Sequence, residues 1–258
     1  MNKLIACALL MAAIVFSPTA VAQTDKPTIV LVHGAFAEAS SWNGVVAILR
    51  KQGYPVVAVA NPLRSVKSDA RYLSDIVDSI KTPVVLVGHS YGGLVIGEVD
   101  SSDRNIKGLV FVAAFAAEMG ETAAGLSGKF PGSTLGTALA PAVTLTTGGK
   151  DLYIRQDKFH DQFAADVAEA EAALMAASQR PVTEAALNEP AGTSAWKRIP
   201  SWFVYGDKDK NIPPSALAFM AERAKSRRTT VVPGASHVVM VSHPDAVAEL
   251  VLAAARSN

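Results

Sequence analysis

A serine flanked by glycines carries the clearest chemical signal in this sequence. Gly88-His89-Ser90-Tyr91-Gly92 follows directly on the apolar run at 84–87. A serine hydroxyl attacks a carbonyl carbon only when a nearby base takes its proton. The pattern G-x-S-x-G after a strand is typical of a nucleophile elbow, a sharp turn that exposes the hydroxyl above a sheet. We therefore predict that Ser90 is a nucleophile, and we expect the chain to supply a base, an acid and an oxyanion hole.

His237 is the histidine best placed to act as the base. It follows the strand expected at 228–232 and precedes a helical pattern at 245–256, so we expect it in a loop at the end of a strand. It also follows the serine and the acid candidates, which is the chain order of triads built around a nucleophile elbow. The four other histidines are interpreted as packing, surface or helix-start residues: His33, His89, His160 and His243.

The acid that would orient His237 is expected after the apolar run at 201–205. Asp207 and Asp209 both lie there. A carboxylate at this place can hold the imidazole in the required tautomer and stabilise its charged form. We favour Asp209 because it lies further into the loop, although either aspartate could simply be a turn residue. Glu118 is a weaker alternative.

Two backbone N–H groups are needed to hold the negative oxygen that develops during acyl transfer. One is expected from Tyr91, the residue after the nucleophile. The other is expected from the loop after the first strand, where Gly34 lets the backbone turn. We assign it to Ala35 and keep Phe36 as an alternative donor or as a wall of the pocket.

Strands and helices alternate around these residues. Buried apolar runs predict strands at 28–32, 56–60, 84–87, 106–114 and 201–205, and a further strand is expected at 228–232. The stretches between them predict helices at 41–52, 67–80, 91–99, 214–225 and 245–256. Continuous apolar strands that alternate with helices are typical of an α/β fold, in which a mostly parallel sheet is covered on both faces.

The pattern changes between about 115 and 200. Gly, Ser and Thr are frequent from 120 to 149, and an Ala- and Glu-rich helical stretch is expected at roughly 157–178. We interpret this segment as a lid inserted over the sheet, with a second small domain as the alternative. Three aromatic residues are predicted to bind substrate, although those in the insertion could equally be lid core: Phe36, Phe115 and Phe159.

The first 22 residues have the pattern of a secretory signal peptide. A short positive start precedes the apolar run at 4–16 and an A-x-A cleavage site that ends at Ala22. The apolar run is shorter than the roughly 20 residues that a bilayer requires, so no stable membrane anchor is expected. The mature domain would then be 23–258, exported to the periplasm or secreted. Cys7, the single cysteine, would be removed with the signal peptide.

Composition and charge narrow the classes of partner and cofactor. The chain has 258 residues, half of them hydrophobic, which suits one domain with a large core. Its 24 Lys and Arg against 23 Asp and Glu leave no basic excess for a nucleic-acid partner. No H-E-x-x-H motif or clustered His and Asp spacing appears, so neither a metal nor another cofactor is expected.

These motifs resemble the α/β-hydrolase superfamily, and most closely its small-esterase branch with the plant methyl esterases and hydroxynitrile lyases. The matching segments are His33-Gly34-Ala35 with Ser41-Trp42, Gly88 to Gly93, Asp209 to Pro213, and Gly234-Ala235 with His237. The resemblance implies a sheet of six parallel strands without the usual leading hairpin. It also implies Ser90, Asp209 and His237 as a triad, with Ala35 and Tyr91 as the oxyanion hole.

The expected function is a serine esterase that acts on small or medium, apolar carboxylic esters. Within the resembling branch, the lyases typically carry Thr where this chain has Gly34, and Lys where it has Val238. Both differences favour ester hydrolysis over cyanide chemistry. A lactonase, an amidase and a lyase-like enzyme stay open as alternatives on the same site. A catalytically silent binding protein for a small ligand is the alternative of another class.

Overall fold

The computed structural model describes residues 26–99 and 105–257. A six-stranded sheet in the order β2-β1-β3-β4-β8-β9 forms its centre, and every neighbouring pair of strands is parallel. The strands are β1 (Thr28–Val32), β2 (Val56–Val59), β3 (Val84–His89), β4 (Ile106–Val112), β8 (Ser201–Gly206) and β9 (Arg228–Val232). The predicted parallel sheet is confirmed, and only the ends of some strands differ from the expected bounds.

Burial explains why the sequences of the central strands are continuous apolar runs. The central strands β1 and β3 are buried at every position, because helices cover both faces of the sheet. The outer strands β2 and β9 keep exposed and half-buried positions. Since all six strands run the same way, their carboxyl ends meet at one edge, where the loops after the strands can combine their side chains.

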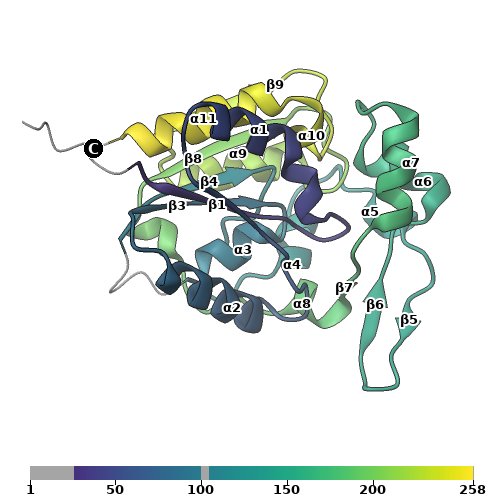
Figure 1. The fold of residues 1–258 in the computed structure, drawn as a ribbon. Helices are drawn as coiled ribbons and strands as arrows, with labels where there is room; N and C mark the ends of the chain where they lie inside the picture. The colour runs from purple at the N-terminus through teal and green to yellow at the C-terminus, as the bar shows by residue number, and fades with distance from the viewer. Residues whose placement is uncertain (1–25, 100–104, 258) are drawn as a thin grey trace, which may run out of the picture.

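Helices cover the two faces as predicted. The helices and 3-10 turn outside the insertion are η1 (Ala39–Trp42), α1 (Asn43–Lys51), α2 (Val66–Ser79), α3 (Gly92–Gly97), α9 (Pro214–Arg223), α10 (Val239–Ser242) and α11 (Pro244–Arg256). Helices α1 and α11 contact each other on one face, and α2 and α3 contact each other on the opposite face (Figure 1). Helix α9 packs against β8.

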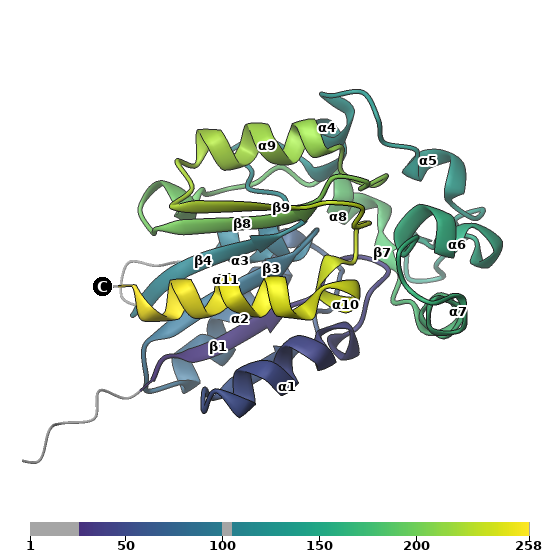
Figure 2. The same cartoon turned by 90° about the horizontal axis from the view of Figure 1, so that it is seen from above.

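The segment between β4 and β8 is built from short elements. They are α4 (Ala123–Gly128), α5 (Leu135–Ala138), β5 (Val143–Thr144), β6 (Lys150–Leu152), α6 (Gln156–Phe163), α7 (Glu169–Ser178), β7 (Val182–Thr183), α8 (Glu184–Asn188) and the 3-10 turn η2 (Ala195–Lys197). Figures 1 and 2 show that α5, α6, α7 and the small strands lie beyond the carboxyl ends of the central strands.

Two features of this insertion differ from the expectation. The single helix expected at 157–178 is two helices, α6 and α7, because the chain turns after Phe163 and directs Asp166 toward the loop that precedes His237. The small antiparallel sheet β5-β6-β7 was not predicted, since its strands are only two or three residues long. Both features depend on tertiary contacts that local sequence patterns do not contain.

The expected signal peptide lies outside the described residues and stays a prediction. Within residues 26–99 and 105–257, no helix combines the length and the apolar character needed to cross a bilayer.

Candidate active site

Ser90 lies in a strained turn between β3 and α3. Its backbone has a φ of 53°, in the left-handed region that residues with a side chain rarely adopt. Close backbone packing holds this turn in place. A Cβ atom on Gly88 would lie 2.6 Å from the carbonyl oxygen of Gly92, and one on Gly92 would collide with the carbonyl oxygen of Val32. The glycines around Ser90 are therefore required by contact as well as by conformation.

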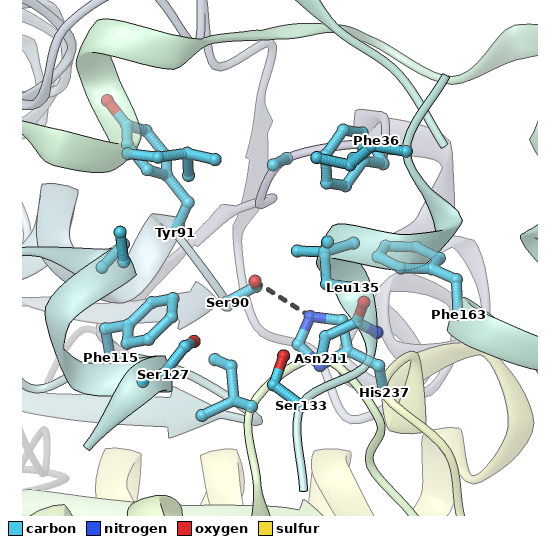
Figure 3. A pocket seen from close by; sticks show the side chains of 18 residues that line it. Phe36, Ser90, Tyr91, Phe115, Ser127, Ser133, Leu135, Phe163, Asn211 and His237 are labelled. Carbon is cyan, nitrogen blue, oxygen red and sulfur yellow. Dashed lines mark hydrogen bonds between the residues drawn. The ribbon is translucent and has the colours of Figure 1, made fainter. Parts of the chain in front are cut away.

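The structure brings Ser90, His237 and Asp209 into one hydrogen-bonded chain. Ser90 Oγ lies 2.9 Å from His237 Nε2, as the dashed line in Figure 3 shows. His237 Nδ1 lies 2.6 Å from Asp209 Oδ2. Because a carboxylate can only accept, Nδ1 carries the imidazole proton, and Nε2 is left free to accept the serine hydroxyl proton. The side chains of His237 and Asp209 are almost completely buried, so water competes little for these hydrogen bonds.

The competing acids face other partners. Asp207 accepts a hydrogen bond from the N–H of Gly234 at 2.7 Å, and Glu118 pairs with Lys197 at 2.6 Å. Asp209 is also held on its second oxygen, which accepts the N–H groups of Asn211 and Ile212 at 2.8 and 3.0 Å. These hydrogen bonds within the turn hold the carboxylate in the orientation in which it accepts from the imidazole.

The two predicted oxyanion donors both lie at the cavity beside Ser90. Within residues 26–99 and 105–257, neither the N–H of Ala35 nor that of Tyr91 donates to a protein acceptor. The alternative donor is already occupied, because the N–H of Phe36 donates to the carbonyl oxygen of Arg180 at 3.0 Å. Phe36 has a φ of 61°, and its ring lines the cavity instead. Among the described residues, the N–H groups of Ala35 and Tyr91 thus have no protein acceptor, and both residues line the cavity together with Ser90.

Close packing positions these donors. A Cβ atom on Gly34 would lie 2.6 Å from Ser90 Cβ and 3.1 Å from the backbone nitrogen of Tyr91. The first loop can therefore approach the elbow only with glycine at this position. On the other side, the Tyr91 hydroxyl donates to Asp69 Oδ2 at 3.0 Å. Burial raises the pKa of Asp69 and of Tyr91, which keeps the Tyr91 phenol protonated as a donor.

His89 and His33 are buried histidines that serve the site through backbone contacts. His89 Nε2 lies 3.2 Å from the carbonyl oxygen of His237, and the two rings lie 4.8 Å apart. Burial, followed by the nearby His237, holds the pKa of His89 well below its ordinary value. Burial also lowers the pKa of His33, whose Nε2 accepts the N–H of Asn61 at 3.0 Å. Their interpretation as packing and hydrogen-bonding residues agrees with these positions.

A cavity of about 330 Å³ opens above Ser90 and His237. Figure 3 shows side chains from the first loop, the elbow, the insertion and the acid loop around it. Its wall is mainly apolar and includes Ala35, Phe36, Phe115, Ala123, Ala124, Leu135, Leu139, Phe163, Leu187 and Ile212. Among the described residues that line it, none is Asp, Glu, Lys or Arg. The cavity therefore presents an uncharged surface to whatever it holds.

Two of the three predicted pocket residues line the cavity, and the third lies behind it. Phe36 and Phe115 are at the wall. Phe159 is fully buried and packs against Phe163, with ring centroids 5.0 Å apart. Phe163 takes the expected place of Phe159 at the cavity, and its ring centroid lies 5.2 Å from that of His237. The two residues lie one helical turn apart, so the sequence predicted an aromatic face but not which ring is exposed to the cavity.

Several residues that line the cavity were not predicted from the sequence. Leu135 and Leu139, spaced as neighbours on a helix face, were the available signal for the outer wall. Asn211 was missed because Asp209-Lys210-Asn211 has the sequence of an ordinary polar turn.

Within the described ranges, no group of three or more His, Cys, Asp or Glu is arranged to hold a metal ion.

Comparison with known protein families adds a finding independent of this geometry. Residues 29–250 match the Alpha/beta hydrolase family. The chain belongs to the alpha/beta hydrolase family.

The relatives of this alpha/beta hydrolase include enzymes with different chemistry. It is 26% identical over 250 residues to Alpha/beta hydrolase nvfD of Aspergillus novofumigatus, covering 89% of this chain and 97% of that protein. It is 24% identical over 241 residues to alpha-hydroxynitrile lyase of Arabidopsis thaliana, covering 85% and 93%. The crystal structure of polyneuridine aldehyde esterase has the same fold, with a TM-score of 0.76, 19% identity, and coverage of 88% and 98%. The predicted resemblance to the branch of methyl esterases and hydroxynitrile lyases is confirmed.

Proposed function

We propose that this alpha/beta hydrolase cleaves carboxylic esters through an acyl intermediate on Ser90. The observation that carries the proposal is the buried chain of two hydrogen bonds from Ser90 to His237 and from His237 to Asp209. These hydrogen bonds end at an apolar cavity that Ala35 and Tyr91 also line, and within the described residues neither of their backbone N–H groups has a protein acceptor. A nucleophile, an oriented base and an oxyanion hole at one place are the groups that acyl transfer requires.

The proposed reaction has two balanced halves. Ser90 Oγ bonds to the ester carbon while His237 Nε2 takes the hydroxyl proton, and the N–H groups of Ala35 and Tyr91 hold the oxyanion. The bond to the alcohol then breaks, and His237 returns the proton to the leaving oxygen. In the second half, a water molecule gives a proton to His237 and bonds to the acyl carbon. The bond to Ser90 breaks, the serine regains its proton, and the carboxylic acid leaves.

The cavity supports small or medium, uncharged substrates. A volume of about 330 Å³ is near the lower end of small-molecule pockets, which are roughly 300–1,000 Å³. A charged group placed against its apolar wall would lose hydration without gaining an ion pair. Neutral esters with apolar acyl or alcohol groups therefore fit the cavity better than anionic ones.

Two positions favour hydrolysis over the lyase chemistry found among the relatives. The space beside Gly34 is filled by Ser90 and its neighbours, so a Thr side chain would not fit without a backbone shift. Val238, which directly follows the base, is fully buried and apolar. It therefore cannot supply the positive charge that a lysine would bring to a leaving cyanide.

A panel of chromogenic esters, lactones and anilides with increasing acyl length tests the proposal. We expect the wild type to hydrolyse neutral esters, with lower rates for acyl chains that exceed the cavity and for anionic esters. The variant Ser90→Ala should lose about 1,000-fold or more in kcat, because no other group replaces the nucleophile. Ester hydrolysis at the wild-type rate by Ser90→Ala would contradict the proposal. A preference for lactones or anilides would keep the mechanism and change the substrate class.

We also propose that the enzyme is exported and that its mature form begins at Gln23. The support is the positive start, the apolar run and the A-x-A site of residues 1–22. Fractionation of a Gram-negative host that expresses the whole chain, with intact-mass measurement of the product, tests this. A periplasmic or secreted product with Gln23 at its start is expected. Full-length protein confined to the cytoplasm would contradict export without affecting the esterase proposal.

A further inference from the structure

Helix α6 of the insertion is bonded to the loop that carries Asp209. Gln162 Nε2 donates to the carbonyl oxygen of Lys210 at 2.9 Å and to Asn211 Oδ1 at 3.1 Å. In return, Asn211 Nδ2 donates to the carbonyl oxygen of Gln162 at 3.2 Å. Thr134 supplies the remaining bond, because its hydroxyl donates to Gln162 Oε1 at 2.7 Å. Both amide side chains belong to buried residues, so these bonds fix the acid loop against α6 in one arrangement.

The turn that follows α6 is bonded to the loop that carries His237. Asp166 Oδ1 accepts the N–H of Ser236, the residue before the base, at 3.0 Å. The Ser236 hydroxyl donates to the carbonyl oxygen of Phe163 at 3.3 Å. Burial works to raise the pKa of Asp166, but hydrogen bonds from Ser236 and Ser242 together outweigh it and hold the pKa below its ordinary value. Asp166 is therefore a carboxylate near neutral pH, and it accepts a charge-assisted hydrogen bond.

One short segment thus contacts both of the loops that carry Asp209 and His237. Asp209 and His237 come from different loops, and the hydrogen bond between their side chains is 2.6 Å long. Residues 162–166 bind the backbone next to each of them. Small displacements of reacting groups reduce rates strongly, since about 1 Å can cost about 100-fold. A segment that sets the relative position of the two loops can therefore control the rate without touching the substrate.

We propose that Gln162 and Asp166 are positioning residues that hold the acid loop and the histidine loop in register for catalysis. The inference rests on the proposed esterase function of Ser90. It gives the insertion a second task besides walling the cavity. It also requires α6 to stay seated during turnover, so that any movement that admits substrate is made by other parts of the insertion.

Steady-state kinetics of Gln162→Ala and Asp166→Ala test this inference. The concentration of competent sites is measured by titration with a fluorophosphonate, and kcat is expressed per titrated site. We expect kcat per site to fall by about 10-fold or more, with KM for a short ester changed less than about 2-fold, because neither residue lines the cavity. Asp166→Asn should recover most of the loss that Asp166→Ala causes, since its amide oxygen can still accept from Ser236.

Asp157→Ala is the matched control. Asp157 lies on the same helix, but it is exposed and pairs with Arg155 inside the insertion. Its kcat and KM should equal those of the wild type. If kcat per site is unchanged in both alanine variants, or if only KM rises, the positioning role is wrong and α6 serves only packing or substrate binding.

Proton NMR supplies a readout that needs no substrate. The short bond between His237 Nδ1 and Asp209 predicts a far-downfield imidazole N–H signal in the wild type and in Asp157→Ala. We expect this signal to broaden or move upfield in Gln162→Ala, because the acid loop loses its anchor. An unchanged signal would overturn the inference even if the wild type hydrolysed no tested ester. The absence of both ester hydrolysis and fluorophosphonate labelling in the wild type would instead reject the proposed function.

Discussion

At the scale of single residues, the site depends on where side chains are absent as much as on where they are present. The first loop reaches the elbow only because Gly34 has no Cβ. In the proposed function, the N–H of its neighbour Ala35 acts together with that of Tyr91, and within the described residues neither donates to a protein acceptor. An oxyanion hole stabilises charge only when its donors are fixed before the charge develops. In the proposed mechanism, close contact between the first loop and the elbow provides that fixation.

Gly34→Ala should therefore reduce activity while the protein still folds. The new Cβ would lie 2.6 Å from Ser90 Cβ, so the first loop must move away and take the N–H of Ala35 with it. Loss of one oxyanion donor typically costs about 100- to 1,000-fold in kcat, and we expect a loss in this range for neutral esters.

Gly97→Ala is the control for this prediction. Gly97 lies on α3, a few residues beyond the elbow, and apart from its own helix backbone and chain neighbours a Cβ there would meet no atom of the described residues within 4 Å. Its activity should equal that of the wild type. Equal activity of Gly34→Ala and Gly97→Ala would show that the first loop does not shape the oxyanion hole.

Asp209→Asn and Asp207→Asn should separate the two acid candidates. In Asp209→Asn, the new amide could offer His237 an N–H in place of a carboxylate oxygen. This favours the wrong tautomer of the imidazole, and kcat should fall by about 10,000-fold. Asp207 accepts from the N–H of Gly234 instead, so its variant should stay within about 3-fold of the wild type, as expected for a partly exposed turn residue. A larger loss for Asp207→Asn would reverse the assignment.

His89 should make folding stability depend on pH. Its pKa in the folded protein lies well below the ordinary value of 6.5, so the unfolded chain binds more protons between these two values. Stability from this residue is present above pH 6.5 and is lost as the pH falls, at up to about 1.4 kcal/mol per pH unit. Asp69, with its raised pKa, acts in the opposite direction, so a variant must be compared with the wild type.

Urea unfolding of the wild type and His89→Gln measures this contribution. The free energy of unfolding of the wild type should fall more steeply between about pH 7.5 and about pH 5.5 than that of His89→Gln, which has no group to titrate in this range. Glutamine can still donate to the carbonyl oxygen of His237, as His89 Nε2 does. Identical pH slopes would contradict a neutral, buried His89.

At the scale of elements, contacts between segments distant in the sequence support the turn that carries Ser90. Helix α2 presents Asp69 to the Tyr91 hydroxyl. Arg64, just before α2, pairs with Asp151 of the insertion at 2.7 Å and donates to the carbonyl oxygen of Pro181 at 2.7 Å. The insertion, α2 and the turn after Ser90 therefore form one connected unit. No local sequence pattern predicts this connection.

Tyr91→Phe tests whether that unit supports the oxyanion hole. The phenylalanine keeps the ring and removes the hydrogen bond to Asp69, which should lower the free energy of unfolding by about 1–3 kcal/mol. Activity should fall less than in Gly34→Ala, because the backbone N–H of residue 91 is still present. Thermal unfolding and ester kinetics on the same preparation measure both effects. An unchanged free energy of unfolding would show that the hydrogen bond between Tyr91 and Asp69 does not stabilise the fold.

The strands and the order of the chemical groups could be predicted because local patterns encode them. Buried parallel strands are continuous apolar runs, and a strained serine turn needs glycines beside it. The insertion could not be predicted in the same way. The break between α6 and α7 follows from the contact between Asp166 and Ser236, and the choice of Phe163 over Phe159 at the cavity follows from how α6 is seated. Such features are set by partners far away in the chain.

At the scale of the whole molecule, the sheet gathers five distant parts of the chain at one edge. The loop after β1, the turn after β3, the insertion and the loops after β8 and β9 all contribute to the cavity (Figure 3). The rigid parallel sheet fixes where the loops begin, and the insertion determines the shape of the space between them. This division explains why relatives with one fold include both an esterase and a lyase.

The proposed function requires Ser90 to be a nucleophile that His237 activates in this cavity. Mass-spectrometric peptide mapping after treatment with a fluorophosphonate is the sharpest test, because the reagent reacts by far the fastest with an activated serine and requires no knowledge of the substrate. We expect a single adduct on Ser90 in the folded wild type, much slower labelling of His237→Ala, and none of Ser90→Ala. An adduct on another serine that persists in Ser90→Ala, or an unlabelled Ser90 in folded wild type, would contradict it.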